Sequence, residues 1–324
     1  MIDQIAKFLV EKDGFVVVTH VNPDGDAIGS LLGMYLSLKE IGKKVVGVMG
    51  ANFPESFAFL PGNTEMIVGW ELLGFNPSCV IAIDVADRER IAPSISGLKK
   101  AYSCLINIDH HPTNPGYGDI NFIRPHANSS TQLVYELLCK MGYKLNVNVS
   151  KCLYTGLVTD TGCFKFSGVT SRTFELAAKL LAPGVDSYDV TKCLFEELPE
   201  SRLTLERLML ERLEFLLDGK LALSYLDLED YEKIGASLNE GENIVNRLRE
   251  TRGVEVGGLI TALADNSCKV SLRSKGMLDV STIASKLGGG GHRRAAGIKS
   301  SLGYQDMRLE LISLVKKSLE NEGV

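Results

Sequence analysis

Features that would place this chain outside the cell or in a membrane are missing from its sequence. The seven cysteines are odd in number and include no C-x-x-C pair, which argues against a disulfide framework and against a zinc ribbon. The stretch 1–7 contains an acid and lacks the long apolar core of a secretory signal. No uncharged apolar run approaches the length of a membrane-spanning helix. We therefore expect a cytoplasmic protein without a membrane partner.

The chain also lacks the strong positive charge of proteins that coat long nucleic acids. Its formal net charge is −5 over 324 residues, so long duplex nucleic acid is not an expected partner. The charge is uneven, however. Between Ser267 and Ser300, seven lysines and arginines stand against a single acid, Asp279, which leaves a local charge of +6. A small anionic substrate fits this local excess better than a long polymer does.

A strand, a turn and a helix near the N-terminus form the most informative stretch of the sequence. The β-branched run 15–18 predicts a buried strand, which breaks at an Asn-Pro-Asp-Gly turn before apolar residues at helical spacing over 26–41. His20, Asp24 and Asp26 therefore come to the carboxyl end of a strand, where open α/β sheets bind ligands. Taken alone, the two acids are equally compatible with a solvated turn that caps the helix.

Strand and helix patterns alternate through the first half of the chain. Further buried strands are predicted over 44–49, 78–84 and 103–109, and helices over 129–141 and 149–158. This alternation indicates an α/β fold with a mostly parallel sheet flanked by helices.

A different pattern begins near Pro183. Helices are predicted over 186–193 and 199–217, and a smaller α/β domain follows. The elements predicted in that domain are a strand at 220–227, a helix at 242–251, strands at 254–264 and 268–273, and helices at 279–287 and 305–321. The predicted division is a first α/β domain, a helical linker and a second domain, over residues 1–185, 186–217 and 218–324.

Acids and histidines follow the predicted strand ends and one helix end. Besides the three near the N-terminus, they are Asp84, Asp109, His110, His111 and Asp160. Because parallel strands end at one sheet edge, most of these groups should meet there. Oxygen and imidazole ligands without a thiolate favour an ion such as Mn²⁺. About four carboxylates in one pocket call for two divalent ions, which can share a water and lower its pKa.

Together these residues resemble the four motifs of the DHH phosphoesterase family. In the family's order, the matching segments are His-x-x-x-Asp-x-Asp at 20–26, Asp84, Asp109-His110-His111 and Thr159-Asp160-Thr161-Gly162. The run 288–297 resembles the glycine-rich signature of the DHHA1 domain. Length and layout are most similar to the subfamily of oligoribonucleases (nanoRNases) that are also 3′-phosphoadenosine 5′-phosphate phosphatases.

The resemblance implies two divalent metal ions, expected to be Mn²⁺, that share the carboxylate of Asp84. The implied ligands are His20, Asp24 and Asp84 for the first ion, and Asp26, Asp84, His110 and Asp160 for the second. The implied catalytic residues are Asp84, Asp109 and His111.

The resemblance also implies distinct roles for two of these neighbours. Asp109 would orient an imidazole by accepting its second N–H. His111 would face the substrate phosphate; the alternative is a histidine that only binds the backbone.

Substrate binding is assigned to the second domain by the same resemblance. The implied residues are Arg273, Ser274, Gly289, Gly290, Gly291, His292 and Arg294. Consecutive glycines let backbone N–H groups approach a phosphate, and arginine offers fork-shaped donors. A glycine run by itself would instead indicate a flexible linker.

The implied function is a phosphohydrolase that cuts very short RNAs to nucleoside 5′-monophosphates and removes the 3′-phosphate of 3′-phosphoadenosine 5′-phosphate. A phosphodiesterase for cyclic di-AMP or for its linear dinucleotide product would share every motif. Manganese pyrophosphatases share the metal motifs but lack the glycine-rich segment. A catalytically silent nucleotide-binding module would need a missing ligand, and none is missing. Substrate preference, polarity of digestion, the physiological metal and the choice between monomer and homodimer stay open.

Overall fold

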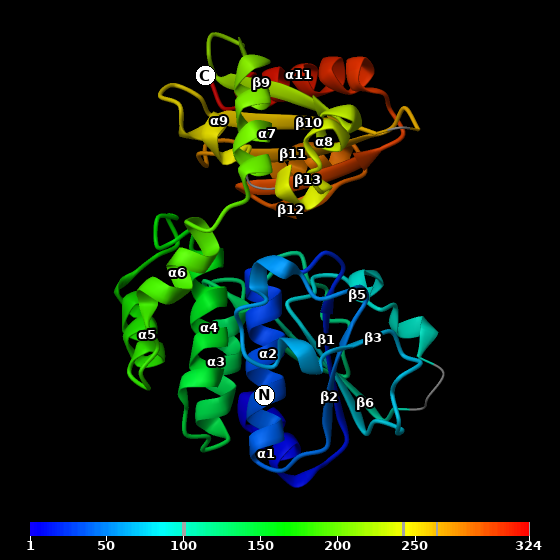
Figure 1. The fold of residues 1–324 in the computed structure, drawn as a ribbon, viewed down its shortest axis with the longest axis vertical. Coiled ribbons are helices and arrows are strands. Elements are labelled where there is room, and N and C mark those ends of the chain that lie inside the picture. The colour runs from blue at the N-terminus through cyan, green and yellow to red at the C-terminus, as the bar shows by residue number, and fades with distance from the viewer. Residues whose placement is uncertain (99–101, 242–243, 264, 324) are drawn as a thin grey trace. The chain divides into compact units, whose positions relative to one another are not determined.

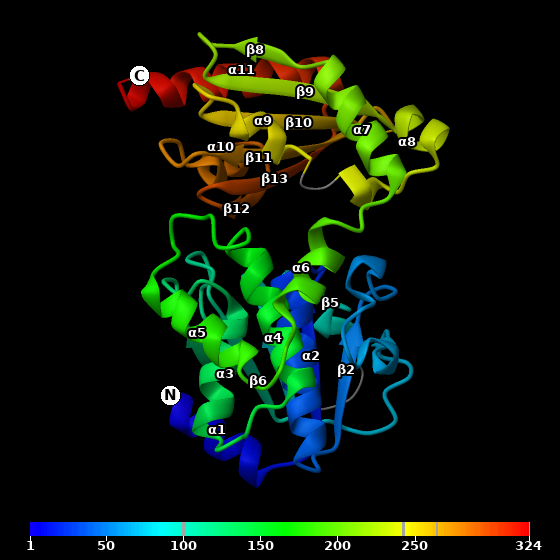
Figure 2. The same cartoon turned by 60° about the vertical axis from the view of Figure 1, so that its left-hand side comes forward.

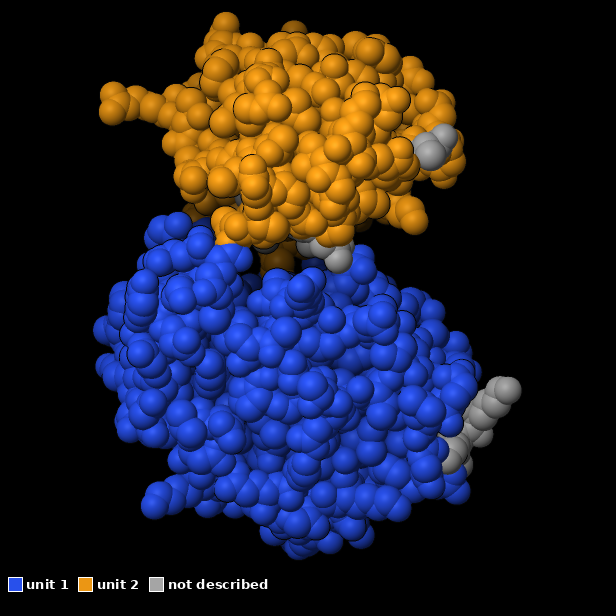
Figure 3. All heavy atoms as spheres, viewed as in Figure 1, with its two compact units in different colours: residues 1–197 blue, residues 198–324 orange. Residues whose placement is uncertain are grey.

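The chain divides into two compact units, which Figure 3 shows in different colours. Unit 1 is Met1–Glu197 and unit 2 is Leu198–Val324. The computed structural model describes residues 1–98, 102–241, 244–263 and 265–323.

Each helix of the stretch predicted as a linker packs within one unit. Helix α6 (Ser187–Phe195) buries Val190 in the core of unit 1. Helix α7 (Glu200–Glu211) buries Leu205 and Met209 in a core of unit 2. The division at residue 197 thus lies between the two helices, because each has an apolar side that needs a partner.

Unit 1 is built on a sheet in the order β3-β2-β1-β4-β6-β7, with neighbouring strands parallel. These strands are β1 (Phe15–His20), β2 (Val45–Met49), β3 (Ile67–Val68), β4 (Cys79–Ile83), β6 (Cys104–Asp109) and β7 (Ile120–Ile123). The short β5 (Ile91–Ala92) pairs antiparallel with the end of β1. The central strands β1, β4 and β6 are buried throughout, as apolar strands of a parallel sheet are. The predicted α/β class is confirmed.

One face of this sheet packs against helices, of which α2, α3 and α4 run side by side in Figure 1. The helices of unit 1, besides α6, are α1 (Ile2–Glu11), α2 (Gly25–Glu40), α3 (Ser130–Lys140), α4 (Val147–Asp160) and α5 (Ser171–Leu181). Phe15 and Ile81 point to that face, whereas Val16 and Val80 pack on the other face with Trp70. Of the short 3₁₀ turns, Arg88–Arg90 and Ile95–Gly97 accompany this second layer. The turns Glu55–Phe57 and Asn63–Glu65 lie on the helix side, where Phe57 packs on the first core and Glu65 accepts from Tyr35 of α2. Alternate side chains along each strand therefore pack into two separate cores, one on each face of the sheet.

Unit 2 has a mixed sheet in the order β12-β13-β11-β10-β9-β8. Its strands are β8 (Glu214–Leu216), β9 (Leu221–Asp227), β10 (Val256–Ala262), β11 (Cys268–Ser274), β12 (Gly290–His292) and β13 (Ala295–Ser300). Only β9 and β10 are parallel among the described pairs. One core lies under α10 and α11, the other under α7, α8 and α9, so helices cover both faces (Figure 2). These helices, besides α7, are α8 (Leu228–Ile234), α9 (Asn246–Glu250), α10 (Val280–Lys286) and α11 (Tyr304–Asn321).

Two expectations for this part of the chain are wrong in detail. The helix predicted over 199–217 ends at Glu211, and 214–216 is strand β8. Positive φ angles at Leu217, Asp218 and Gly219 reverse the chain, so that β8 can pair with β9. The helix predicted over 242–251 is shorter among the described residues: α9 covers Asn246–Glu250, and residues 242–243 lie outside the described ranges.

In the described part of the chain, no helix combines the length and apolar character needed to cross a membrane.

Candidate metal centre

Three adjacent parallel strands of unit 1 deliver the first polar residues to one edge of the sheet. His20 ends β1, Asp84 directly follows β4, and Asp109 ends β6. Register pairs Ile83 with Ile108 across β4 and β6, which places the following residues side by side. Asp84 adopts a φ of +60°, uncommon for a residue with a side chain, at the point where the chain leaves the sheet.

Helix ends complete the cluster. Asp24 is the N-cap of α2 and accepts hydrogen bonds from the Asp26 and Ala27 N–H groups, each at 3.1 Å. Asp26, in the first turn of α2, accepts from the N–H groups of Ser130 at 2.5 Å and Thr131 at 2.9 Å at the start of α3. Two helix N-termini thus stabilise these carboxylates.

Glycines let α2 and α4 pack closely enough for Asp160, the last residue of α4, to reach the cluster. A methyl group on Gly29 would lie 2.4 Å from the Cys152 carbonyl oxygen. A methyl group on Gly156 would lie 2.9 Å from an Asp26 carboxylate oxygen. No side chain fits between the helices at these two positions, so the contact depends on glycine.

The carboxylates and imidazoles meet within a few ångströms. His110 Nε2 lies 3.5 Å from Asp160 Oδ2, 3.6 Å from Asp84 Oδ1 and 3.8 Å from Asp26 Oδ2. His20 Nε2 lies 3.7 Å from Asp84 Oδ2. The seven residues predicted from sequence as ligands or neighbours of Asp84 are therefore brought together by unit 1: His20, Asp24, Asp26, Asp109, His110, His111 and Asp160.

The ligand atoms form groups suited to a cation. His20, Asp24 and Asp84 offer three donor atoms that all lie within 4.8 Å of one another, and Asp26, Asp84 and His110 do the same. A third such group is Asp84, Asp109 and His111. Asp84 is common to all three groups, which is the arrangement that a shared carboxylate requires.

Hydrogen bonds fix which imidazole nitrogen faces the carboxylates. His20 Nδ1 donates to the Val21 carbonyl at 2.7 Å, and His110 Nδ1 donates to the Ala127 carbonyl at 3.2 Å. Because a carbonyl can only accept, Nδ1 carries a proton, which leaves Nε2 as the nitrogen that faces the acids and can bind a metal once it has lost its own proton. Nitrogen and carboxylate donors without sulfur fit Mn²⁺ or Mg²⁺ better than a structural zinc. The residues present thus fit a divalent metal.

The electrostatics of the cluster also call for cations. Burial, followed by the charges of Asp84 and Asp160, raises the pKa of Asp26 well above its usual value. Burial and the charges of Asp24 and Asp84 raise the pKa of Asp160 in the same way. Burial lowers the pKa of His20, but the nearby Asp84 and Asp24 outweigh it and raise the pKa to about 9. Without metal, the cluster therefore holds protons that bound cations would replace.

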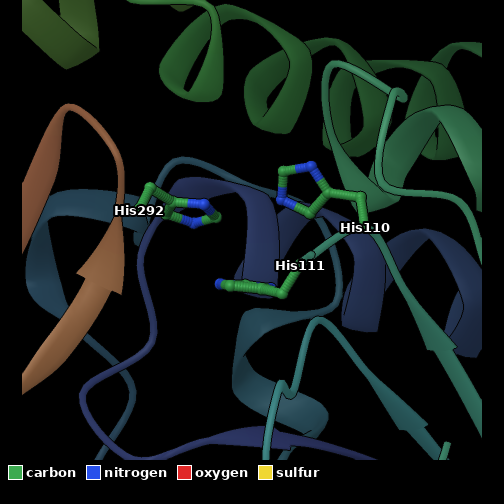
Figure 4. A group of neighbouring side chains, drawn as sticks. All are labelled: His110, His111 and His292. Carbon is green, nitrogen blue, oxygen red and sulfur yellow. The ribbon is translucent and has the colours of Figure 1, made fainter. Parts of the chain in front are cut away.

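Asp109 positions His111. Its Oδ1 accepts from His111 Nδ1 at 2.8 Å and from the His110 N–H at 2.9 Å. Its Oδ2 accepts from Asn114 Nδ2 at 2.6 Å. The His111 ring lies edge-on to His110, with centroids 5.1 Å apart and an interplanar angle of 70° (Figure 4). A buried carboxylate is thus a partner of the His111 ring, as the resemblance implied for Asp109.

Two residues of this centre escape prediction from the sequence. Ser130 donates from Oγ to Asp84 Oδ1 at 2.9 Å. Asn114 binds both Asp109 and, at 2.8 Å, the buried Asn107 side chain. A polar Asn107 inside an otherwise apolar strand was the available signal, because a buried amide needs a partner.

The residues predicted to bind substrate lie in unit 2, on β11, on β12 and in the segment after β12. Arg273 is half-buried on β11 and donates from Nη1 to the Leu272 carbonyl at 3.0 Å. Arg294 is half-buried just beyond β12. His292, also drawn in Figure 4, ends β12. Ser274 is fully buried, and its hydroxyl donates to the Leu278 carbonyl at 2.8 Å, so its side chain stabilises a turn.

The glycine run is an edge strand rather than an open loop. Gly290 to His292 pair with β13. An added methyl group would lie 2.2 Å from the Gly297 carbonyl oxygen at Gly289 and 2.5 Å from the Ala295 carbonyl oxygen at Gly291. Gly290 has open space at that position. Two of the glycines are thus required by packing on β13, and of the three predicted to bind substrate only Gly290 leaves room for a ligand.

Comparison with known proteins is consistent with these features. Residues 14–157 match the family model described as "DHH family, N-terminal domain", and residues 218–321 match "DHHA1 domain". The bifunctional oligoribonuclease and PAP phosphatase NrnA of Thermus thermophilus is 34% identical over 90% of this chain and 86% of its own length. The protein of the same name from Bacillus subtilis is 30% identical over 88% of each chain. A solved exopolyphosphatase-related protein from Bacteroides fragilis superposes with a TM-score of 0.87 at 27% identity, over 99% of this chain and 95% of that one.

Proposed function

Because this chain belongs to the DHH family of phosphoesterases, with a DHHA1 domain as its second unit, we propose that it hydrolyses very short oligoribonucleotides to nucleoside 5′-monophosphates. We further propose that it removes the 3′-phosphate of 3′-phosphoadenosine 5′-phosphate, as the names of the relatives from T. thermophilus and B. subtilis describe for those proteins. The observation that supports this most directly is the pair of ligand groups that share Asp84.

The proposed cofactor is a pair of Mn²⁺ ions. His20, Asp24 and Asp84 would hold one, and Asp84 with Asp26, His110 and Asp160 the other. Two such ions supply an activated water at neutral pH and stabilise the charge on the attacking and leaving oxygens. Two divalent charges also balance the four carboxylates that the pocket gathers.

The remaining roles fall to groups of the chain itself. Asp109 holds His111 by its Nδ1–H at 2.8 Å, so that the imidazole is fixed in one tautomer. In its doubly protonated form, His111 can then donate from Nε2 to a phosphoryl oxygen or protonate a leaving oxygen. Ser130 keeps the Asp84 carboxylate in place through its hydroxyl. These contacts reduce the reorganisation that the site needs during reaction.

Unit 2 would supply the positive charge that selects a phosphorylated substrate. Arg273 and Arg294 are the proposed donors, together with His292 and the open position at Gly290. A few cations suit a terminal phosphate, whereas binding along a polymer would need an extended basic surface. This favours substrates of very few nucleotides.

A substrate panel tests the proposal. Purified enzyme is incubated with RNAs of two to ten nucleotides, with 3′-phosphoadenosine 5′-phosphate and with cyclic di-AMP, each with Mn²⁺ or Mg²⁺. We expect the shortest RNAs and 3′-phosphoadenosine 5′-phosphate to be hydrolysed fastest, and Mn²⁺ to support the higher rate. A preference for cyclic di-AMP, or activity that survives complete removal of divalent ions, would contradict it.

A further inference from the structure

Glu255 is a buried acid of unit 2 that binds three consecutive backbone N–H groups. It lies just before β10 and is 7% exposed. Its Oε1 accepts from the N–H groups of Gly276 at 3.1 Å, Met277 at 2.7 Å and Leu278 at 3.1 Å. Hydrogen bonds to a carboxylate are stronger than those between neutral groups, and burial protects them from water. Glu255 therefore fixes the loop that joins β11 to α10.

That loop supports the side chain of Arg294. Gly276 has a φ of +117°, and a methyl group on it would lie 2.5 Å from Arg294 Nη2 and 2.9 Å from Cζ. The guanidinium therefore rests directly on the Cα of Gly276. Arg293 donates from Nε to the Gly276 carbonyl at 3.3 Å, which ties the segment after β12 to the same loop.

The surroundings of Arg294 are those of an anion-binding group. Among the residues that the structure describes, its side chain forms no hydrogen bond and no ion pair, although it is half-buried. Burial lowers the pKa of Arg249; the charge of Glu250 opposes this, and the smaller contribution of the Arg294 charge lowers the pKa further. Two guanidinium groups thus repel each other here, and a phosphate placed beside them would relieve that repulsion.

We propose that Glu255 is a positioning residue for substrate binding, which acts through the loop at Gly276 to hold the Arg294 guanidinium against a substrate phosphate. This inference rests on the proposed function, because it takes Arg294 as a phosphate-binding residue. Glu255 itself does not touch substrate. Its removal should therefore change KM more than kcat.

A double-mutant cycle on hydrolysis of dinucleotide RNA and of 3′-phosphoadenosine 5′-phosphate tests this coupling. Glu255→Ala and Arg294→Ala should each raise KM about tenfold, with kcat changed by no more than about twofold. The double variant should show the KM of Arg294→Ala alone, because Glu255 acts through that side chain. Additive effects of the two substitutions, or an unchanged KM for Glu255→Ala, would overturn the proposal.

Two further variants keep the test decisive if Glu255→Ala does not fold. Glu255→Gln retains an oxygen that can accept from the loop, so its KM should rise by only about two- to threefold. Gly276→Ala leaves Glu255 in place but puts a methyl group where the guanidinium lies, so its KM should rise as much as that of Arg294→Ala. Wild-type KM in Gly276→Ala would count against the proposal.

Asp230 provides a matched control in the same unit. It is 8% exposed, accepts from Arg212 Nη2 at 2.9 Å and accepts from the Asp227 N–H at 2.7 Å. Asp230→Asn should lower the Tm and leave KM unchanged. An equal rise in KM would indicate general loosening of unit 2 and refute a specific role of Glu255.

The outcomes also separate this inference from the function on which it rests. A wild-type enzyme inactive on both substrates would overturn the proposed function and this inference with it. An active wild type whose Glu255→Ala variant keeps its KM would overturn the inference alone.

Discussion

Contacts between side chains help to hold the site of unit 1, whereas two arginines near the predicted substrate site of unit 2 donate to the backbone. In unit 1, Asp109 fixes His111 and Ser130 fixes Asp84 through contacts between side chains. In unit 2, Arg273 and Arg293 donate to backbone carbonyls. The first arrangement concentrates negative charge and needs cations; the second presents positive charge and suits an anion. Substitutions in the site of unit 1 should therefore lower kcat, and substitutions in the predicted substrate site of unit 2 should raise KM.

The largest expected effect comes from Asp84→Ala, which removes the carboxylate common to the three ligand groups that lie within unit 1. We expect kcat to fall on the order of a thousandfold or more, because loss of metal positioning removes several kcal/mol of transition-state stabilisation. Mn²⁺ affinity, measured by calorimetry, should fall with it. Circular dichroism should show a folded protein.

Asp87→Ala is the matched control for this prediction. Asp87 is exposed three residues away and caps a 3₁₀ turn by accepting from the Glu89 N–H at 3.0 Å. Its removal should leave kcat and Mn²⁺ affinity unchanged. Mn²⁺-dependent turnover that persists in Asp84→Ala would contradict the assignment of metal-dependent catalysis to the Asp84 cluster of unit 1.

His111→Gln should lower kcat about a hundredfold, the usual range for one proton-transfer group, with Mn²⁺ affinity largely kept. Asp109→Asn should act in the same direction, because an amide no longer favours the Nδ1–H tautomer of His111. Single-turnover kinetics at saturating substrate measure this loss. Wild-type kcat in both variants would show that His111 does not take part in the reaction.

The two units also differ in how much of their site can be predicted from the sequence. The strands that carry His20, Asp84 and Asp109 are local apolar runs ended by polar residues, so a reader of the sequence can place them at one sheet edge. That Asp160 joins them depends on Gly29 and Gly156, which allow a helix contact that no local pattern reveals.

Unit 2 is harder to predict because its site depends on pairings between distant segments. The glycine run becomes strand β12 only because β13 is present to pair with it. The local pattern over 214–216 predicts helix, but pairing with β9 makes this stretch strand β8, because a tertiary contact overrides local propensity. Glu255 lies about twenty residues along the chain from the N–H groups it binds, and no motif in the adjacent sequence identifies it as their partner.

Metal binding by unit 1 should depend on pH, because cations must displace protons from the cluster. The pKa of His20 is raised to about 9, so below that value the metal-free imidazole is charged and must lose its proton to become a ligand. Mn²⁺ affinity should therefore rise with pH by about tenfold per unit for one released proton and level off above about pH 9. Calorimetry in two buffers of different ionisation enthalpy counts the protons. Affinity that is independent of pH between 6 and 8 would contradict the assignment of His20.

The smallest expected effect comes from unit 2. Arg273→Ala should raise KM about five- to tenfold, as loss of one charge-assisted hydrogen bond to phosphate does, with kcat nearly unchanged. Lys269→Ala, on the same strand β11, is the comparison variant, because it removes equal charge at a position not assigned to substrate. If both variants raise KM equally and salt abolishes the difference from wild type, the effect is diffuse attraction rather than a specific contact. If Arg273→Ala instead lowers kcat at constant KM, unit 2 takes part in the chemistry, and the division of labour between the units fails.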